Sequence, residues 1–134
     1  MDEAASPGPP VDDPGERFAR ALGAKDAAAL KTLLAPDVDF RALTPGEAWE
    51  SRDRNEVVDD IFFGEWLEPH DHVTDVLSVE TDAVGPRCRV GYRFALTNPD
   101  GRYQVEQQAY FDVRDEQISW LRIVCSGYQP DPDH

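Results

Sequence analysis

Cysteine and long apolar runs are both scarce in this sequence. Its 134 residues include only two cysteines, Cys88 and Cys125, which lie far apart and form no CxxC pair. Two distant cysteines give weak support for a disulfide, so we interpret both as free thiols of a cytoplasmic protein. No apolar stretch approaches the roughly 20 residues of a membrane-spanning helix. The opening MDEAASPGPP also lacks the basic and apolar regions of a signal peptide.

Positive charge is scarce too. The chain has 13 Lys and Arg against 27 Asp and Glu, which gives a formal net charge of −14. Because phosphate binding needs concentrated Lys and Arg, we expect neither nucleic acid nor a membrane surface as partner. The EPHDH stretch places His70 near His72, but a zinc site needs three or four ligands and the only other histidine is terminal. We therefore expect no metal, and the absence of a P-loop or GxGxxG motif leads us to expect no cofactor.

The two ends of the chain differ in composition from its middle. Residues 1–13 and 130–134 are rich in Pro and Asp and show no apolar periodicity. Such segments bury too little apolar surface to offset the entropy lost on ordering, so we expect both to be disordered. The remaining residues 14–129 are long enough to form one domain with its own core.

Helical patterns occupy the first half of this domain. Phe18, Ala21 and Leu22 recur at i, i+3 and i+4, and Asp26 can cap a second short helix. A short strand is expected at 37–43, followed by a loop at 44–51. A third helix is predicted for residues 53–68, where Asp and Glu three positions apart fit a capping box before a wide apolar stripe.

The second half alternates like β-strands, and the NPDG turn fixes how two of them pair. Counting back from this turn places Tyr92 opposite Gln107 and Arg93 opposite Glu106, on opposite faces of the sheet. Helices followed by long antiparallel strands indicate an α+β fold.

A two-residue turn at positions 115 and 116 would join the last two strands. This turn predicts that Phe111 pairs with Trp120 and that Ala109 pairs with Arg122. A slip of one residue would move every side chain of the last strand to the other face, because side chains alternate with a period of two.

With this pairing, Tyr92, Gln107 and Arg122 lie together on an otherwise apolar face. Burying Gln or Arg without partners costs several kcal/mol. The three side chains therefore either satisfy one another in a closed polar core or line a cavity that admits water or a ligand. Asp75 is predicted on the same face as Val73, where it is either hydrogen-bonded locally or the carboxylate of such a cavity.

The opposite face carries both polar and apolar side chains. Arg93 and Glu106 would form an exposed cross-strand ion pair, which we interpret as structural. Tyr110, Leu121 and Ile123 add apolar surface to this face, which favours an interface with another subunit.

The order and spacing of these elements resemble the nuclear transport factor 2-like superfamily, which includes SnoaL-like polyketide cyclases, ketosteroid isomerase and scytalone dehydratase. The resemblance covers residues 14–129. It rests on RFARALGAKDAAALKTLLAPDVDF, SRDRNEVVDDIF, HVTDVLSVE and YQVEQQAYFDVRDEQISWLRIV. It implies a cone-shaped α+β fold, with N-terminal helices packed on a strongly curved, mostly antiparallel sheet. It also implies a cavity for an apolar or aromatic small molecule and a homodimer through the outer sheet face.

The resemblance also suggests where chemistry would lie. In the isomerase pattern an Asp base ends the first strand, but here Phe40 stands near that position and Asp39 points to the other face. No second carboxylate is found on the cavity face. Cyclase and dehydratase members use His and Asp acid–base groups, for which the nearest candidates here are His72 and Asp75.

These considerations define a site and two classes of function. We predict His72 and Asp75 as catalytic residues. The predicted ligand-binding residues are Tyr92, Gln107, Arg122, Trp120, Phe40 and Phe62. One function is cofactor-free acid–base catalysis of the isomerase, cyclase or dehydratase type, in which Arg122 would favour a carboxylate or enolate. The alternative is a non-catalytic ligand-binding or dimeric interaction module, because this fold hosts both.

Overall fold

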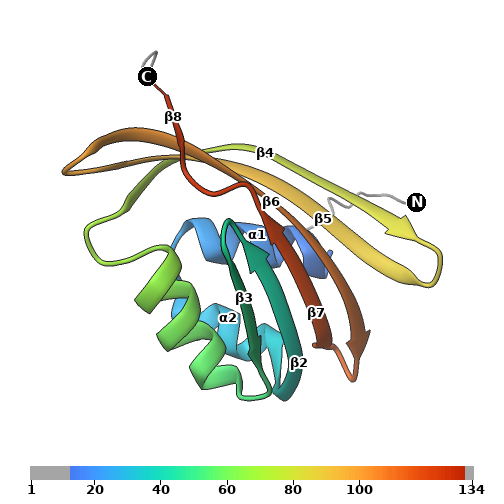
Figure 1. Ribbon diagram of the computed structural model, residues 1–134. Helices are drawn as coiled ribbons and strands as arrows, with labels where there is room; N and C mark the ends of the chain where they lie inside the picture. Colours follow the sequence, from blue (N-terminus) through green and yellow to red (C-terminus); the bar gives the residue numbers. More distant parts are fainter. Residues whose placement is uncertain (1–12, 132–134) are drawn as a thin grey trace.

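The computed structural model describes residues 13–131, in which three helices pack on the concave side of one curved sheet (Figure 1). The α+β class is therefore confirmed. In chain order the elements are α1 (Pro14–Gly23), α2 (Ala27–Leu33), β2 (Leu34–Thr44), β3 (Glu47–Ser51), the π-helix η2 (Glu56–Trp66), β4 (His72–Val84), β5 (Arg87–Asn98), β6 (Gly101–Arg114), β7 (Gln117–Cys125) and β8 (Gln129–Pro130).

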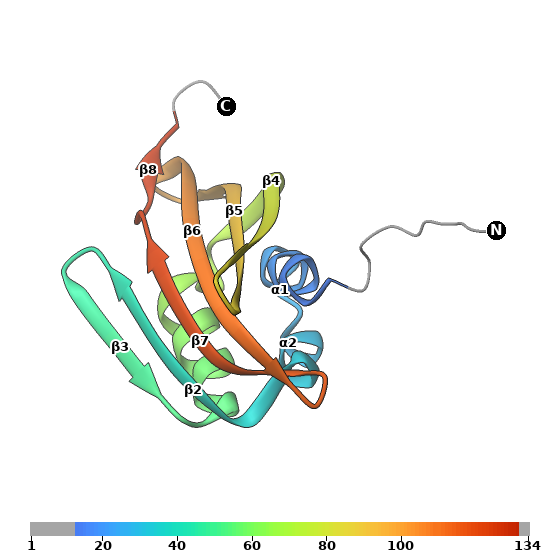
Figure 2. The same ribbon diagram turned by 90° about the vertical axis from the view of Figure 1, so that its right-hand side faces the viewer.

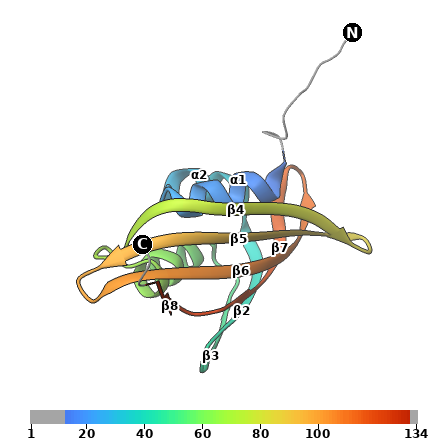
Figure 3. The same cartoon turned by 90° about the horizontal axis from the view of Figure 1, so that it is seen from above.

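The sheet has the strand order β3-β2-β7-β6-β5-β4, and β8 pairs with β6. All paired strands run antiparallel except β2 and β7, which are parallel. The long strands β4, β5 and β6 run side by side, while β2 and β3 cross below them (Figure 3). Figure 2 shows η2 in the hollow of the sheet behind β6 and β7. The expected strongly curved, mostly antiparallel sheet is confirmed.

Helix α1 lies directly on the sheet because two glycines allow a close approach. A Cβ atom at Gly15 would lie 3.0 Å from Cβ of Val90, and one at Gly23 would lie 3.1 Å from the ring of Phe94. The helix begins at Asp13, whose carboxylate accepts a 2.7 Å hydrogen bond from the Gly15 amide. Asp13, which the sequence places in the N-terminal tail, is thus the helix cap.

The core fills the space between the helices and the concave face of the sheet. Its aromatic centre is Phe62, whose ring meets Phe18 at 6.0 Å and Phe40 at 5.7 Å in edge-to-face geometry. All three side chains are fully buried. Aromatic pairs in this geometry add about 0.5–1.5 kcal/mol beyond the area they bury.

The third helix is present, but its hydrogen bonding differs from the prediction. Residues 56–66 form a π-helix, in which the amide of Leu67 still reaches the carbonyl of Phe62 at 2.7 Å. The predicted capping box is wrong in both halves, because the Asp53 carboxylate accepts from the amide of Asn55 rather than from that of Glu56. The Glu56 carboxylate accepts from the hydroxyl of Ser51, and that hydroxyl in turn accepts from the amide of Asp53.

The segment 44–51 is not the loop that we expected. A tight turn at Pro45 and Gly46, with φ of +78° at the glycine, reverses the chain. The following residues, Glu47–Ser51, form an edge strand against β2. This strand is short, polar and largely exposed, so it lacks the apolar alternation that reveals a strand in a sequence.

The pairing of β5 with β6 is as predicted. Tyr92 lies opposite Gln107, and Arg93 lies opposite Glu106. The Arg93 and Glu106 side chains form an ion pair at 3.2 Å, and both are exposed. The predicted structural role of Glu106 on the outer face is consistent with this geometry.

The pairing of β6 with β7 begins as predicted and then shifts by one residue. Val113 lies opposite Ile118, but the next pair joins Asp112 to Trp120, so Ser119 is the extra residue of a β-bulge. The turn that precedes this pair places two non-glycine residues at positive φ, as a two-residue hairpin turn requires.

The bulge reverses the faces of β7, and the predictions for this strand are wrong. The observed pairs are Phe111 with Leu121, Tyr110 with Arg122, and Ala109 with Ile123. Leu121 and Ile123 are 0% and 1% exposed, so they belong to the core rather than to an outer apolar surface. Trp120 and Arg122 lie on the outer face instead.

Strand β4 contains similar irregularities. Val73 pairs with Leu96, whereas Asp75 pairs with Ala95, because the register shifts between them. Asp75 therefore does not share the face of Val73, contrary to prediction, and its side chain is exposed.

The chain remains paired close to its C-terminal end. Pro130 belongs to β8, and the amide of Asp131 donates to the carbonyl of Arg102 at 2.9 Å. The rest of the two predicted tails, residues 1–12 and 132–134, lies outside the described residues. Between positions 13 and 131 the structure contains no helix with the length and apolar character of a membrane span.

Candidate functional site

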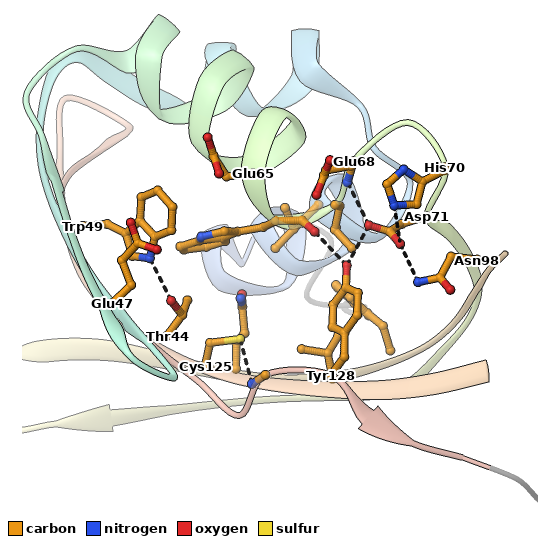
Figure 4. A pocket seen from close by; sticks show the side chains of 17 residues that line it. Thr44, Glu47, Trp49, Glu65, Glu68, His70, Asp71, Asn98, Cys125 and Tyr128 are labelled. Atoms are coloured by element: carbon orange, nitrogen blue, oxygen red, sulfur yellow. Dashed lines mark hydrogen bonds and ion pairs between the residues drawn. The ribbon is translucent and has the colours of Figure 1, made fainter. Parts of the chain in front are cut away.

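A cavity of about 350 Å³ opens at one end of the molecule. Its wall is formed by the C-terminal end of η2 and the loop that follows, by the β2–β3 hairpin, and by side chains from β5, β6 and the segment after β7 (Figure 4). Small-molecule sites typically measure about 300–1,000 Å³. The space therefore suits a small organic ligand.

Asp71 is the buried carboxylate of this cavity. The residue is only 2% exposed. Its carboxylate accepts hydrogen bonds from the Glu68 amide at 3.0 Å, the Asn98 side chain at 2.9 Å and the Tyr128 hydroxyl at 3.0 Å. Nε2 of His70 lies 3.8 Å away, nearer to the solvent. Donors from three parts of the chain thus hold the carboxylate in one orientation.

The Tyr128 hydroxyl faces two acceptors but has one hydrogen. Its oxygen lies 2.7 Å from the carbonyl oxygen of Trp66 and 3.0 Å from Oδ2 of Asp71. Burial, followed by the charge of Asp71, raises the pKa of Tyr128 well above its ordinary value. The phenol therefore stays neutral and can donate to either acceptor.

Lys25 supports the Asp71 loop from behind. This residue has φ of +55° in the turn between α1 and α2. Its ammonium donates to the main-chain carbonyls of Glu68 at 2.8 Å and Asp71 at 2.7 Å. Lys25 does not line the cavity, so its role is to position the loop.

Tyr92 and Gln107 mark the boundary between the core and the cavity. The Tyr92 hydroxyl donates to Oε1 of Gln107 at 2.5 Å, and the two residues are 2% and 6% exposed. Burial, with a smaller effect of Cys125, raises the pKa of Tyr92 well above its ordinary value. Gln107 lines the cavity, and its Nε2 has no hydrogen-bond partner in the part of the chain that the structure describes. The amide therefore has a free donor for a ligand.

Aromatic rings form much of the remaining wall. Trp49 and Trp66 meet at 6.1 Å with their planes at 83°, and Trp49 is held by a 2.8 Å hydrogen bond from its indole nitrogen to Thr44. The indole nitrogen of Trp66 is buried without a partner among the described residues. The two indoles thus combine apolar surface with one unused donor.

The predicted catalytic pair lies outside this cavity. His72 and Asp75 are both exposed on β4, and neither lines the cavity wall. Their catalytic role stays a prediction, which their position does not support. His70 and Asp71, which directly precede His72 in the EPHDH motif, line the cavity instead.

Two predicted ligand-binding residues belong to the outer face. Arg122 donates to the main-chain carbonyl of Asp39 at 2.7 Å and pairs with its carboxylate at 3.2 Å. The guanidinium groups of Arg87 and Arg122 lie 3.6 and 4.3 Å from the ring centre of Trp120. The expected cluster of Arg122 with Tyr92 and Gln107 is therefore wrong, because the bulge places Arg122 on the opposite side of the sheet.

Two others, Phe40 and Phe62, are packed in the closed core and do not line the cavity. Of the predicted ligand-binding residues, Gln107 reaches it, with Tyr92 directly behind. Within residues 13–131, no three His, Cys, Asp or Glu side chains are grouped closely enough to hold a metal ion.

The sequence analysis missed Asp71, Asn98 and Tyr128. Asp71 and Tyr128 are 57 positions apart, so no local pattern joins them. One signal in the sequence is the glycine that follows the last long strand, Gly127, because glycine readily adopts positive φ. Its φ is +74°, and the chain turns toward the cavity there.

Comparison with known proteins places this fold. No curated protein sequence matches the chain significantly. An NTF2-like protein from Burkholderia thailandensis superposes with a TM-score of 0.61 at 16% identity, over 86% of this chain and 89% of that chain. An LEH-like epoxide hydrolase from M. tuberculosis gives 0.62 at 18% identity, over 84% and 80%. A candidate polyketide cyclase from Streptomyces antibioticus gives 0.62 at 20% identity, over 84% and 89%.

These likenesses confirm the nuclear transport factor 2-like fold that the sequence resembles, and at such identities they show the fold alone. The family is shown by the sequence itself. Residues 16–121 match the family model of the SnoaL-like domain, which is most of the chain. The protein therefore belongs to the SnoaL-like family.

Proposed function

We propose that the protein binds a small apolar or aromatic carbonyl compound in its cavity and moves a proton on it with Asp71. The observation that carries this proposal is a carboxylate that is 2% exposed, lines a cavity and is held by three donors. A general base must be fixed within reach of the proton that it takes, in a site that excludes most water.

Gln107 would stabilise the charge that forms during this step. When Asp71 takes a proton from the carbon next to a carbonyl, the C–H electron pair moves toward the carbonyl oxygen. The free Nε2 of Gln107 can donate to that oxygen, and its orientation is fixed beforehand because Tyr92 holds Oε1. This arrangement retains the predicted oxyanion role for Gln107 and removes Arg122 from it.

Tyr128 would adjust to the protonation of Asp71. While Asp71 is ionised, the phenol can donate to it. Once Asp71 holds the substrate proton, the phenol can donate to the Trp66 carbonyl instead, at 2.7 Å. Return of the proton from Asp71 to the γ-carbon of a β,γ-unsaturated ketone gives isomerisation. Transfer of the same proton to a β-hydroxyl as the enolate expels it releases water and gives dehydration. Neither requires a cofactor.

The alternative from the sequence, a non-catalytic module, divides into two. A ligand-binding protein without turnover uses the same cavity. The interaction module loses two of its three proposed residues, because Leu121 and Ile123 are buried. The homodimer and the cytoplasmic location stay predictions.

The test is hydrogen–deuterium exchange at the α-carbon of 2-tetralone, an aromatic ketone, followed by NMR in D₂O. We expect wild-type protein to accelerate exchange, and Asp71→Asn to lower that acceleration at least ~100-fold, as expected when a general base is lost. Asn is nearly isosteric and keeps one acceptor oxygen, so 2-tetralone should still bind. The matched control is Asp75→Asn, which removes an exposed carboxylate from β4.

Each other outcome is informative. Unchanged exchange by Asp71→Asn would overturn the proposed role of this residue. Loss of exchange in Asp75→Asn alone would restore the catalytic residue predicted from the sequence. Binding of 2-tetralone without exchange by the wild-type protein would favour the ligand-binding alternative.

A further inference from the structure

The entrance of the cavity carries negative charge. Glu47 and Glu65 are exposed at its rim, Glu68 is half-buried and Asp71 lies inside. Among the described residues that line it there is no Lys or Arg, and His70 is the only basic side chain. Charges of one sign around a cleft attract ligands of the opposite sign and repel those of the same sign.

The ammonium group of Lys25 does not enter the cavity to neutralise its acidic side chains. Lys25 lies behind the loop, and its Nζ is bound to the main-chain carbonyls of Glu68 and Asp71. A ligand in the cavity meets the carboxylate side of this loop. An anionic ligand, which Arg122 would have favoured, finds no cationic side chain of Lys or Arg there.

The aromatic walls suit a cation as well. Trp49 and Trp66 stand nearly perpendicular, so a group beside one ring face lies close to the other ring. Cations bind favourably over indole faces, and the gain increases when the site excludes water. On the outer sheet face the protein places its own Arg87 and Arg122 against Trp120. Within the described residues, no Lys or Arg is stacked in this way on Trp49 or Trp66.

The inner end of the cavity differs from its entrance. Gln107 is 6% exposed, and its Nε2 is a donor without a partner in the described chain. A ligand group that binds there must therefore be a hydrogen-bond acceptor rather than a cation. A ligand that satisfies both ends has an acceptor inside and a positive charge outside. Asp71, which also lines the cavity, is already held by three donors.

We infer that the ligand is an aromatic carbonyl compound that also carries a cationic amine, with its ammonium or quaternary ammonium group in the corner formed by the perpendicular rings of Trp49 and Trp66 and near Glu47 and Glu65. The acceptor at its other end, directed to Gln107, is the carbonyl of the proposed function, on which this part of the inference rests. The cation site itself depends only on the aromatic and acidic residues of the entrance.

The test compares two probes that differ at one atom. Choline carries a trimethylammonium group, and 3,3-dimethylbutan-1-ol has carbon in place of its nitrogen. Trp120→Phe protein leaves Trp49 and Trp66 as the only tryptophans, so their fluorescence reports binding at the entrance. We expect choline to bind at least ~10-fold more tightly than the alcohol, and added salt to weaken choline alone.

Variants locate the site. Changing both Glu47→Gln and Glu65→Gln should weaken choline at least ~3-fold and leave the alcohol unchanged, because only the cation senses the lost charges. Trp49→Leu should weaken choline more strongly. The matched charge control is Glu80→Gln with Glu116→Gln, which removes two exposed carboxylates elsewhere.

Equal affinity for the two probes, or no saturable choline binding up to about 50 mM, would overturn the inference. An equal loss in the control variant would show a general effect of net charge and would also overturn it. The 2-tetralone experiment is separate, because this neutral ketone does not need the cation site. Failure of the amine inference therefore leaves the role of Asp71 intact. Failure of the exchange experiment removes the carbonyl end of the ligand but leaves the cation site at Trp49 and Trp66 intact.

Discussion

Two polar clusters lie on opposite faces of the same sheet and follow different chemistry. On the concave face, Tyr92 and Gln107 form a neutral pair that is nearly completely buried. On the convex face, Arg122 combines an ion pair to Asp39 with a stacked contact on Trp120. The extra residue of the β-bulge, Ser119, is the reason that Arg122 lies on the convex face and not on the predicted concave face.

Solvent explains the difference between the clusters. The Arg122 and Asp39 side chains retain 26% and 27% exposure, so water still solvates their charges. Burying an ion costs far more than burying an amide, which accounts for the neutral pair inside. A neutral pair with one unused donor beside a cavity is, by contrast, a feature that a ligand can complete. The concave cluster is therefore where function is expected.

The largest effect on stability should come from a substitution on the buried face of β7. Leu121→Ala should lower the free energy of unfolding by about 2–5 kcal/mol, because Leu121 is fully buried. Val124→Ala should change it by less than about 0.5 kcal/mol, because Val124 is 52% exposed. Urea unfolding measures both. The reverse order would contradict the bulge and restore the uninterrupted alternation.

The second largest effect should be a loss of folding stability at alkaline pH, caused by two tyrosines on the concave side of the sheet. The pKa values of Tyr92 and Tyr128 are raised above the ordinary 10.0, mainly by burial. The stability that their neutral forms provide is complete below pH 10 and is lost as pH rises further, because the unfolded chain releases those protons first. The loss should reach about 1.4 kcal/mol per pH unit for each tyrosine.

Urea unfolding between pH 8 and 11 measures this slope, and the Tyr92→Phe, Tyr128→Phe double variant is the comparison. The variant should be less stable at pH 8 because it loses both hydroxyl hydrogen bonds, but its slope above pH 10 should be smaller. An unchanged slope would mean that other groups cause the alkaline loss.

Disrupting the convex cluster should have a smaller effect. Arg122→Ala removes a partly exposed ion pair, a hydrogen bond to the Asp39 carbonyl and the contact with Trp120. We expect a loss of about 1 kcal/mol, since solvent screens the charges. Binding of choline and 2-tetralone should not change, because Arg122 is outside the cavity. A change in either affinity would return Arg122 to the site.

The smallest effect belongs to the exposed pair of Arg93 and Glu106. A double-mutant cycle with Arg93→Ala and Glu106→Gln should give a coupling energy below about 0.5 kcal/mol, decreasing with salt, because both side chains are largely in water. A coupling above about 1 kcal/mol at high salt would show that the convex face is not solvated as the structure indicates.

The contrast between β6 and β7 shows how far the sequence could predict this fold. Alternation and the NPDG turn were sufficient to pair Tyr92 with Gln107, because β5 and β6 contain no irregularity there. In β7 the core residues Ile118 and Leu121 are three positions apart. Buried residues of a regular strand lie an even number of positions apart, so this odd spacing indicates a bulge.

The cavity could be predicted less well than the fold. Its buried carboxylate, Asp71, receives a donor from Tyr128 only because distant segments meet in space. Single-residue patterns favoured the adjacent His72 and Asp75, which have suitable chemistry but face the solvent. Residue type was informative, whereas orientation depended on loop geometry and register shifts that leave little local pattern.

The π-helix η2 has a consequence for how the cavity of this protein can change. Each residue of an α-helix turns the chain by about 100°, and a π-helix carries one more residue within each hydrogen-bonded loop. Deleting a single codon within Glu56–Trp66 would allow α-helical bonding and would rotate Trp66 away from its neighbours in the cavity wall. In evolutionary terms, a single deletion would move Trp66 within the cavity wall while every strand of the sheet keeps its sequence.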